Sequence, residues 1–208
     1  FGMAGLLDMD HQDTYSKDLK FRFAYLISKY QLEKPIIRPL QFYKHRPDNF
    51  PTVRLAQFAM IYHQFSNLFS RVVELTTMDG IYDVFRISPS NFWNTHYVLD
   101  KQSPFKSKLV SKSFIDLIVL NTLIPIRFAY SQSVGTEDTE SLLQIVQSIT
   151  PEKNTIIDRF DFFGVSAQNA FQTQALLQLK KEYCDKSGCL KCQIGIELIK
   201  GNSKCNLS

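Results

Sequence analysis

Three of the four cysteines of this chain lie close together near its end, and thiolates so spaced could hold a metal. Cys184, Cys189 and Cys192 form the pattern C-x4-C-x2-C at what the sequence predicts to be a corner between two helices. Thiolates at a tight turn can converge on one ion. The pattern therefore indicates a candidate site for zinc or for an iron–sulfur cluster.

The fourth ligand of such a site is open. Cys205 could supply it from the polar tail GNSKCNLS, or a ligand could come from residues upstream of Phe1. The same spacing occurs in plant-type [2Fe–2S] ferredoxins, but their flanking sequences differ from this one, so we infer no redox role. The alternative is three reduced thiols, some of them packed as small apolar groups. The sequence favours the thiols, because three ligands alone are weak evidence for a metal.

A second candidate is the densest basic region of the chain, which is suited to binding phosphates. Its basic side chains are interleaved with aromatic ones, in the order Phe42, Tyr43, Lys44, His45, Arg46, Phe50 and Arg54. Cations neutralise phosphates and aromatic faces stack on bases, so Lys44, His45, Arg46 and Arg54 form a candidate surface for single-stranded or distorted nucleic acid. The plainer interpretation, which surface statistics favour, is a solvated helix entrance where Arg54 pairs with a carboxylate.

The remaining polar residues do not form a complete catalytic constellation. Asp116 and Asn121 lie in an apolar run, where structural hydrogen bonding is the favoured role. Trp93 and His96 could line a pocket, but packing of a loop is the favoured interpretation. The four histidines show no metal-ligand spacing, and the sequence contains no glycine-rich phosphate loop or nucleophile elbow. We therefore do not expect the chain to be catalytic by itself.

Composition predicts a globular protein of one domain. Of the 208 residues, 44% are hydrophobic and 13% aromatic, which is enough for one sizeable core. The net charge of +4 permits contact with nucleic acid but is below the bias of a dedicated binder. Few cysteines crowded at one end favour a reducing cytoplasm. The long apolar run at residues 114–130 includes Asp116, Pro125 and Arg127, so we expect no membrane span.

Helical periodicity with capping residues runs through most of the chain. Asp13 or Thr14 can cap the first helix, Pro51 suits a first turn, and Gly135 can close the longest helix. We expect NFWNTH to be a loop and residues 100–111 to be an exposed connector. Helices are predicted at residues 14–31, 51–62, 65–75, 78–86, 113–130, 138–149, 151–162, 166–184 and 193–200.

The run at residues 113–130 is apolar on nearly every side, which predicts a central buried helix that Pro125 should bend. No convincing β alternation is present. The predicted fold is therefore all-α, an irregular bundle of about seven to nine helices around this buried helix. We expect a single domain at residues 1–200 and a flexible tail at 201–208.

Several stretches together resemble a known family. They are FGMAGLL, RPDNFPTVRLAQFA, WNTHY, SFIDLIVLNTLIPIRFAY and NAFQTQALLQLKKEYCDKSGCLKCQIG. In this order they resemble the second half of the bacterial proteins grouped as the domain of unknown function 2851 family, over nearly all of residues 1–194. The resemblance implies that an upstream half, similar in pattern to PD-(D/E)XK nucleases, precedes this chain as its partner. It also implies that the magnesium-binding carboxylates belong to that half.

Two functional hypotheses follow from the sequence. In the first, the chain is a helical companion of the nuclease-like half and contacts nucleic acid through residues 44–54. In the second, it is a structural or protein-interaction domain whose cysteines bind metal or simply pack. A metal assay of the purified protein would distinguish the two roles proposed for the cysteines.

Overall fold

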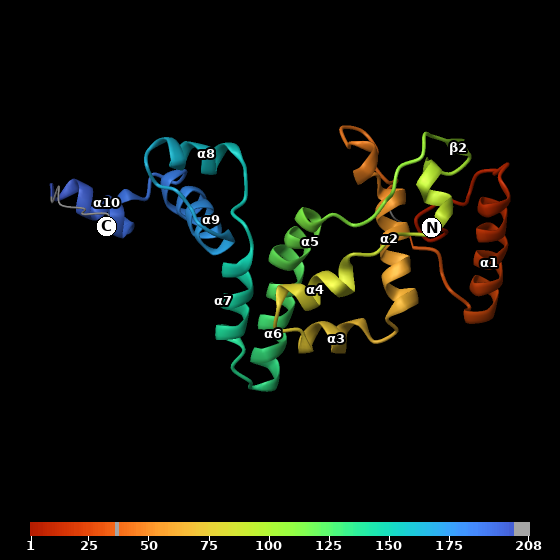
Figure 1. The fold of residues 1–208 in the computed structure, drawn as a ribbon, viewed down its shortest axis with the longest axis horizontal. Coiled ribbons are helices and arrows are strands. Elements are labelled where there is room, and N and C mark those ends of the chain that lie inside the picture. The colour runs from red at the N-terminus through yellow and green to blue at the C-terminus, as the bar shows by residue number, and fades with distance from the viewer. Residues whose placement is uncertain (36–37, 202–208) are drawn as a thin grey trace. The chain divides into compact units, whose positions relative to one another are not determined.

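The computed structural model describes residues 1–35 and 38–201, and helices make up nearly all of their regular secondary structure (Figure 1). The all-α prediction is confirmed. The sequence predicted one domain over residues 1–200, whereas the chain forms two compact units. Unit 1 comprises residues 1–75 and 79–117, and unit 2 comprises residues 76–78 and 118–208. The predicted tail, including Cys205, lies outside the described residues except for Gly201.

Unit 1 holds the first five α-helices, in part or whole, and a short hairpin. Asp13 caps the first helix as predicted, since its carboxylate accepts a hydrogen bond from the Ser16 N–H, and Pro51 begins the second. The elements are α1 (Thr14–Tyr30), a 3-10 turn (Pro47–Asn49), α2 (Pro51–Gln64), α3 (Leu68–Glu74), α4 (Met78–Phe85), a 3-10 turn (Asn91–Thr95), β1 (His96–Val98), β2 (Lys101–Gln102) and α5 (Lys112–Ile118).

The core of unit 1 forms around Trp93, whose side chain is fully buried. Val53 and Ala56 on α2 pack against it, and the Phe1 ring stacks on it at 5.5 Å between centroids. The indole N–H donates a hydrogen bond to the Tyr15 hydroxyl at 3.2 Å. The segment NFWNTH was predicted as a loop that packs on the core, and it does pack there, as a 3-10 turn followed by the first residue of β1.

The segment that follows β2 is an exposed connector over most of its length, as predicted, but two of its residues are buried. Lys108 and Val110 are buried, and the Val110 N–H donates to the Ile87 carbonyl at 3.0 Å. The segment runs beside α2, where the Gln57 side-chain amide donates to the Lys108 carbonyl at 2.7 Å. The prediction of exposure from proline and lysine content is therefore wrong only at Lys108 and Val110, which pack toward the core.

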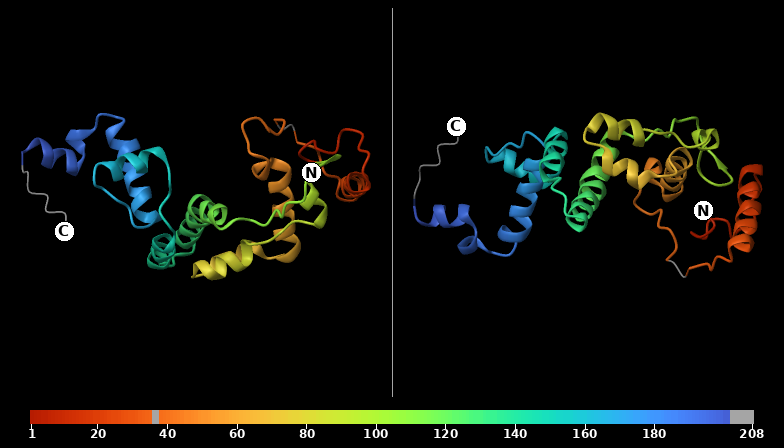
Figure 2. Two further views of the ribbon diagram at one scale, coloured as in Figure 1. Left: turned by 45° about the horizontal axis from the view of Figure 1, so that its top comes forward. Right: turned by 90° about the horizontal axis from the view of Figure 1, so that it is seen from below.

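The longest helix is continuous from Lys112 to Val134, through α5, a π-helical turn (Val119–Leu123) and α6 (Ile124–Val134) (Figure 2). The wider turn accommodates Pro125, which has no N–H to donate to the carbonyl four residues earlier. Gly135 ends the helix in the left-handed region, as predicted.

The prediction that this helix is buried on every side is wrong. Buried residues recur every fourth position along one stripe, while large apolar side chains on the other faces are exposed. An apolar sequence permits burial all round, but neighbouring elements cover only this stripe. The stripe consists of Ile115, Val119, Leu123, Arg127 and Ser131.

By length and composition, Lys112–Val134 could also cross a membrane. It has 23 residues, its most apolar window has a mean hydropathy of 1.4, and 28% of that window is buried. Core helices of water-soluble proteins pass the same test, so this property does not distinguish the two settings. The expectation that the chain makes no membrane contact stays a prediction.

Unit 2 packs its helices around apolar side chains of α7 and α8, among them Ile145 and Ile157, together with Ile149 at the end of α7. Its helix starts differ from prediction, because Asn154 caps α8 and Asn169 caps α9, where we expected Pro151 and Ser166. The elements are α7 (Thr139–Ser148), α8 (Thr155–Phe162), α9 (Ala170–Gln178), a π-helical turn (Leu179–Cys184), a 3-10 turn (Cys189–Lys191) and α10 (Gln193–Ile199).

Candidate functional site

A basic pocket of about 320 Å³ lies in unit 1 between the start of α2 and the segment after β2. Two stretches about fifty residues apart in the sequence supply its walls. Its charged lining residues are the cations Arg46, Arg54, Lys106 and Lys108 and the single carboxylate Asp48. We call this site the basic pocket.

Arg54, on the first turns of α2, is held in a fixed orientation. Its guanidinium donates to the Gln57 side-chain oxygen at 2.8 Å and to the Asn49 side-chain oxygen at 2.5 Å. One face of the guanidinium lies over the Phe114 ring, 3.4 Å from its centroid. Because this face is covered and two N–H groups are engaged, the remaining N–H groups are preorganised for an acceptor at the edge.

Lys108 is the least exposed cation of the pocket, with 3% of its surface accessible. Its ammonium donates to the Lys106 carbonyl at 2.9 Å and lies 3.9 Å from the centroid of the Tyr97 ring. Among the ion pairs of the described residues, none involves Lys108. A buried ammonium that lacks a carboxylate is costly, which makes the site attractive to an incoming anion.

Asp48 balances part of the positive charge. Its carboxylate pairs with the Lys106 ammonium at 2.5 Å and accepts a hydrogen bond from the Tyr97 hydroxyl at 3.3 Å. The Lys106 hydrogen bond is the main cause that lowers the pKa of Asp48, so the carboxylate stays ionised at neutral pH. Lys106 is therefore partly neutralised, whereas Arg54 and Lys108 are not paired with a carboxylate.

The electrostatics of the basic pocket favour an anion. Burial lowers the pKa of the Lys108 ammonium and that of the Arg54 guanidinium, since both cations have lost part of their hydration. A ligand with negative charge would restore the lost stabilisation of both cations. The site has the cations and amide groups needed to bind a phosphate, and we find no nucleophile–base pair in its lining.

The structure brings together only part of the predicted basic surface. Arg46 and Arg54 line the pocket, but Lys44 and His45 do not. Lys44 is exposed, with its ammonium over the Tyr43 ring at 5.3 Å. Sequence reasoning missed Lys106 and Lys108, because the pocket joins segments that are distant in the sequence. The alternation of lysine with serine and apolar residues in FKSKLV was the one available signal.

Comparison with the sequence models of known families gives a match. The sequence model of one family, described as "Protein of unknown function (DUF2851)", matches residues 1–155. The chain belongs to the DUF2851 family. The basic pocket lies wholly within the matched residues, whereas the three cysteines lie beyond them. No curated protein and no solved structure matches the chain.

The predicted cysteine cluster of this DUF2851 chain is not formed among the residues that the structure describes. Cys184 and Cys189 are exposed and Cys192 is buried, and all three are free thiols. Nowhere in residues 1–35 and 38–201 do three or more His, Cys, Asp or Glu side chains come together as metal ligands would. The assignment of these cysteines to zinc or an iron–sulfur cluster stays a prediction without support from the geometry.

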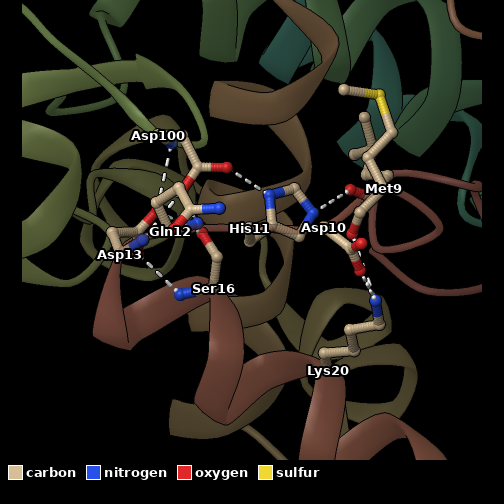
Figure 3. Close-up of polar contacts among 9 residues, drawn as sticks. Met9, Asp10, His11, Gln12, Asp13, Ser16, Lys20 and Asp100 are labelled. Carbon is tan, nitrogen blue, oxygen red and sulfur yellow. Dashed lines mark hydrogen bonds and ion pairs between the residues drawn. The ribbon is translucent and has the colours of Figure 1, made fainter.

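A histidine–aspartate pair in unit 1 has the residue types of a catalytic dyad but a structural geometry (Figure 3). The His11 Nδ1 lies 2.5 Å from the Asp100 carboxylate, and its Nε2 lies 2.9 Å from the Leu6 carbonyl oxygen. Both ring nitrogens are thus engaged, so neither is available to accept a proton from a substrate. Asp100 also accepts hydrogen bonds from the Gln12 and Asp13 N–H groups, which ties the start of α1 to the β1–β2 turn.

This tie predicts loss of stability in acid. The contact with the Asp13 side chain, and then the hydrogen bonds from the Asp13 N–H, from His11 and from the Gln12 N–H, hold the pKa of Asp100 well below its usual range. A carboxyl whose pKa is lower in the folded state stabilises the fold above its unfolded pKa, and that contribution is lost as the pH falls. We expect the urea concentration at the unfolding midpoint to decrease as the pH is lowered below about 4. The decrease should be less steep in Asp100→Asn.

Asparagine tolerates the left-handed backbone that Asp100 adopts at φ 59°, so this substitution tests the charge and not the turn. The urea midpoint at each pH can be followed by the fluorescence of Trp93, the single tryptophan. Asp83→Asn, at an exposed carboxylate on α4, is the matched control. Equal acid sensitivity of the wild type and Asp100→Asn would contradict the assignment.

The other polar residues singled out from the sequence have packing roles where the contacts are known. Asp116 is buried and accepts a hydrogen bond from the Tyr82 hydroxyl at 2.5 Å. Burial, followed by this hydrogen bond, raises the pKa of Tyr82. His96 is buried and stacks on Phe92, with 3.9 Å between the ring centroids. Asn121, expected to be buried, is exposed.

Proposed function

We propose that this DUF2851 chain binds nucleic acid, with a phosphate of the ligand seated in the basic pocket. The observation that supports this proposal most strongly is that Arg54 and Lys108 line the same pocket and that neither forms an ion pair with a carboxylate in the described part of the chain. Phosphates are the anions for which arginine edges and lysine ammonium groups are best suited. Tyr43, three residues before the pocket-lining Arg46 in the sequence, is exposed and offers an aromatic ring for a base.

A role as the helical companion of a nuclease-like half is part of the same proposal. It is supported by the resemblance of the sequence to the second half of the family, and by a basic site that would hold nucleic acid without cleaving it. In this division of labour the chain positions the strand and the upstream half supplies the carboxylates for the metal. The chain is not expected to cleave nucleic acid alone.

The proposal is tested with a fluorescent single-stranded oligonucleotide and the full chain. We expect the dissociation constant from fluorescence anisotropy to rise steeply between about 50 mM and about 200 mM salt, because binding releases counterions. Arg54→Ala should weaken binding about tenfold at low salt, since it removes a charge-assisted contact to phosphate. It should also reduce the slope of log affinity against log salt by about 1.

The matched control is Lys17→Ala, which removes one positive charge from an exposed site on α1 outside the pocket. Its affinity should stay close to that of the wild type. Retention of the Trp93 emission maximum shows that unit 1 of each variant is folded. Absence of binding at low salt, or equal weakening by Lys17→Ala and Arg54→Ala, would rule out the basic pocket as the binding site.

A second candidate function is protein interaction through the end of unit 2. Large apolar side chains are exposed there, including Leu190, Ile194 and Leu198, and exposed apolar patches often mark interaction sites. At this corner Gly195 lets α10 approach the Cys189 backbone more closely than a Cβ would allow. Co-purification of the upstream half with the wild type but not with Leu198→Asp would support this role.

A further inference from the structure

The depth of Lys108 in the basic pocket restricts which phosphate can reach it. The Tyr97 ring lies against its ammonium, and the Lys106 carbonyl takes one of its three N–H donors. The residue is buried yet lines the pocket, so the pocket offers a ligand a route to it. Arg54 is also restricted, because Phe114 covers one face of its guanidinium and two of its N–H groups donate to Gln57 and Asn49.

We propose that the ligand of the basic pocket is a terminal phosphate monoester at the end of a nucleic acid strand, and not a phosphodiester within the strand. This inference rests on the proposed nucleic-acid binding and specifies its ligand.

Charge supports a monoester. A phosphate monoester carries a charge of about −1.5 to −2 at neutral pH, whereas an internal phosphodiester carries one negative charge. Four cations line the pocket, and one of them, Lys106, pairs with Asp48. The other three, Arg46, Arg54 and Lys108, form no ion pair with a carboxylate among the described residues. A doubly charged group can engage the Arg54 edge and the Lys108 ammonium together.

The size of the pocket favours the end of a nucleic acid strand as the ligand. An internal phosphodiester has a sugar on either side, so both sugars would have to enter the pocket before its oxygens reached Lys108. The pocket holds about 320 Å³, which is near the lower limit of about 300 Å³ for small-molecule sites. A terminal phosphate enters with one sugar behind it, and the rest of the strand can leave past the exposed Arg46.

The experiment compares the affinity of the full chain for one oligonucleotide with a 5′-phosphate, with a 3′-phosphate, or with hydroxyl groups at both ends. A nucleoside monophosphate and inorganic phosphate serve as competitors. We expect at least one phosphorylated strand to bind roughly tenfold more tightly than the strand with hydroxyl ends. The preferred end identifies the polarity of the strand in the pocket.

Lys108→Met is the diagnostic variant, because it keeps the length and packing of the stem but removes the buried charge. Replacing an unpaired buried charge by an apolar side chain should leave unit 1 at least as stable. The variant should lose the preference for a phosphorylated end, so that the phosphorylated strands bind it no more tightly than the strand with hydroxyl ends. Lys101→Met, at an exposed lysine on β2, is the matched control and should retain the preference.

The outcomes separate this inference from the proposed function. If all three strands bind equally well and Arg54→Ala still weakens binding, the chain binds nucleic acid but the terminal-phosphate inference is wrong. If the monophosphate binds as tightly as the phosphorylated strand, the ligand is a free nucleotide and the inference is also wrong. If no strand binds at low salt, the proposed function itself fails.

Discussion

Replacing Trp93 by alanine is expected to lower the free energy of unfolding of unit 1 by about 3–5 kcal/mol. The side chain is fully buried and its removal would leave a cavity between α2 and the β1–β2 hairpin. The loss of its hydrogen bond to the Tyr15 hydroxyl adds to this effect. Urea denaturation followed by far-ultraviolet circular dichroism measures the change, since the variant has no tryptophan left to report it.

Two further variants make the result interpretable. Trp93→Phe should cost less than the alanine variant, because it keeps an aromatic ring in the core. Phe105→Ala removes a ring that is 74% exposed and should leave the urea midpoint nearly unchanged. If Trp93→Ala were as stable as Phe105→Ala, the assignment of Trp93 to the core of unit 1 would be wrong.

Replacing Asp138 by alanine should destabilise unit 2 by about 3 kcal/mol, because it removes the carboxylate partner of a buried cation. The Arg127 guanidinium donates to the Asp138 carboxylate at 2.6 Å, and the two side chains are 3% and 26% exposed. This ion pair joins α6 to the start of α7 across the turn at Gly135. Circular dichroism in urea measures the loss.

Glu137→Ala is the matched control, since Glu137 is an exposed carboxylate one residue away. The double variant Arg127→Met with Asp138→Ala should be more stable than Asp138→Ala alone, because no unpaired cation is then buried. Equal stability of the two would mean that the ion pair does not contribute. The basic pocket consists of residues of unit 1, so none of these variants should change oligonucleotide affinity while the chain is folded.

Local signals predicted the helices well. Asp13, Pro51 and Gly135 mark helix ends in the structure as in the sequence, because capping and left-handed closure depend on a few neighbouring residues. The starts of α8 and α9 were misplaced by three or four residues, since several polar residues competed for each cap. The hairpin β1–β2 was missed because strands of three and two residues are too short for alternation to appear.

The candidate site could be predicted only in part. Arg46 and Arg54 stand in one basic stretch with aromatic neighbours, which the sequence shows directly. Lys108 was assigned to an exposed connector, because nothing near it in the sequence reveals that Tyr97 and Gln57 would cover it. The cysteines show the opposite case, in which a suggestive spacing did not become a ligand cluster in the described residues.

The sequence by itself determined the family, the all-α class and most helix positions, because periodicity, caps and ordered motifs act over short distances along the chain. Only the tertiary structure decided that Lys106 and Lys108 meet Arg54 at one pocket, and that the long apolar helix is covered along a single stripe. Both outcomes depend on which elements pack together. The burial and the pKa of a cation such as Lys108 depend on neighbours that are far away in the sequence. Packing, and not the local pattern, decides which residues these neighbours are.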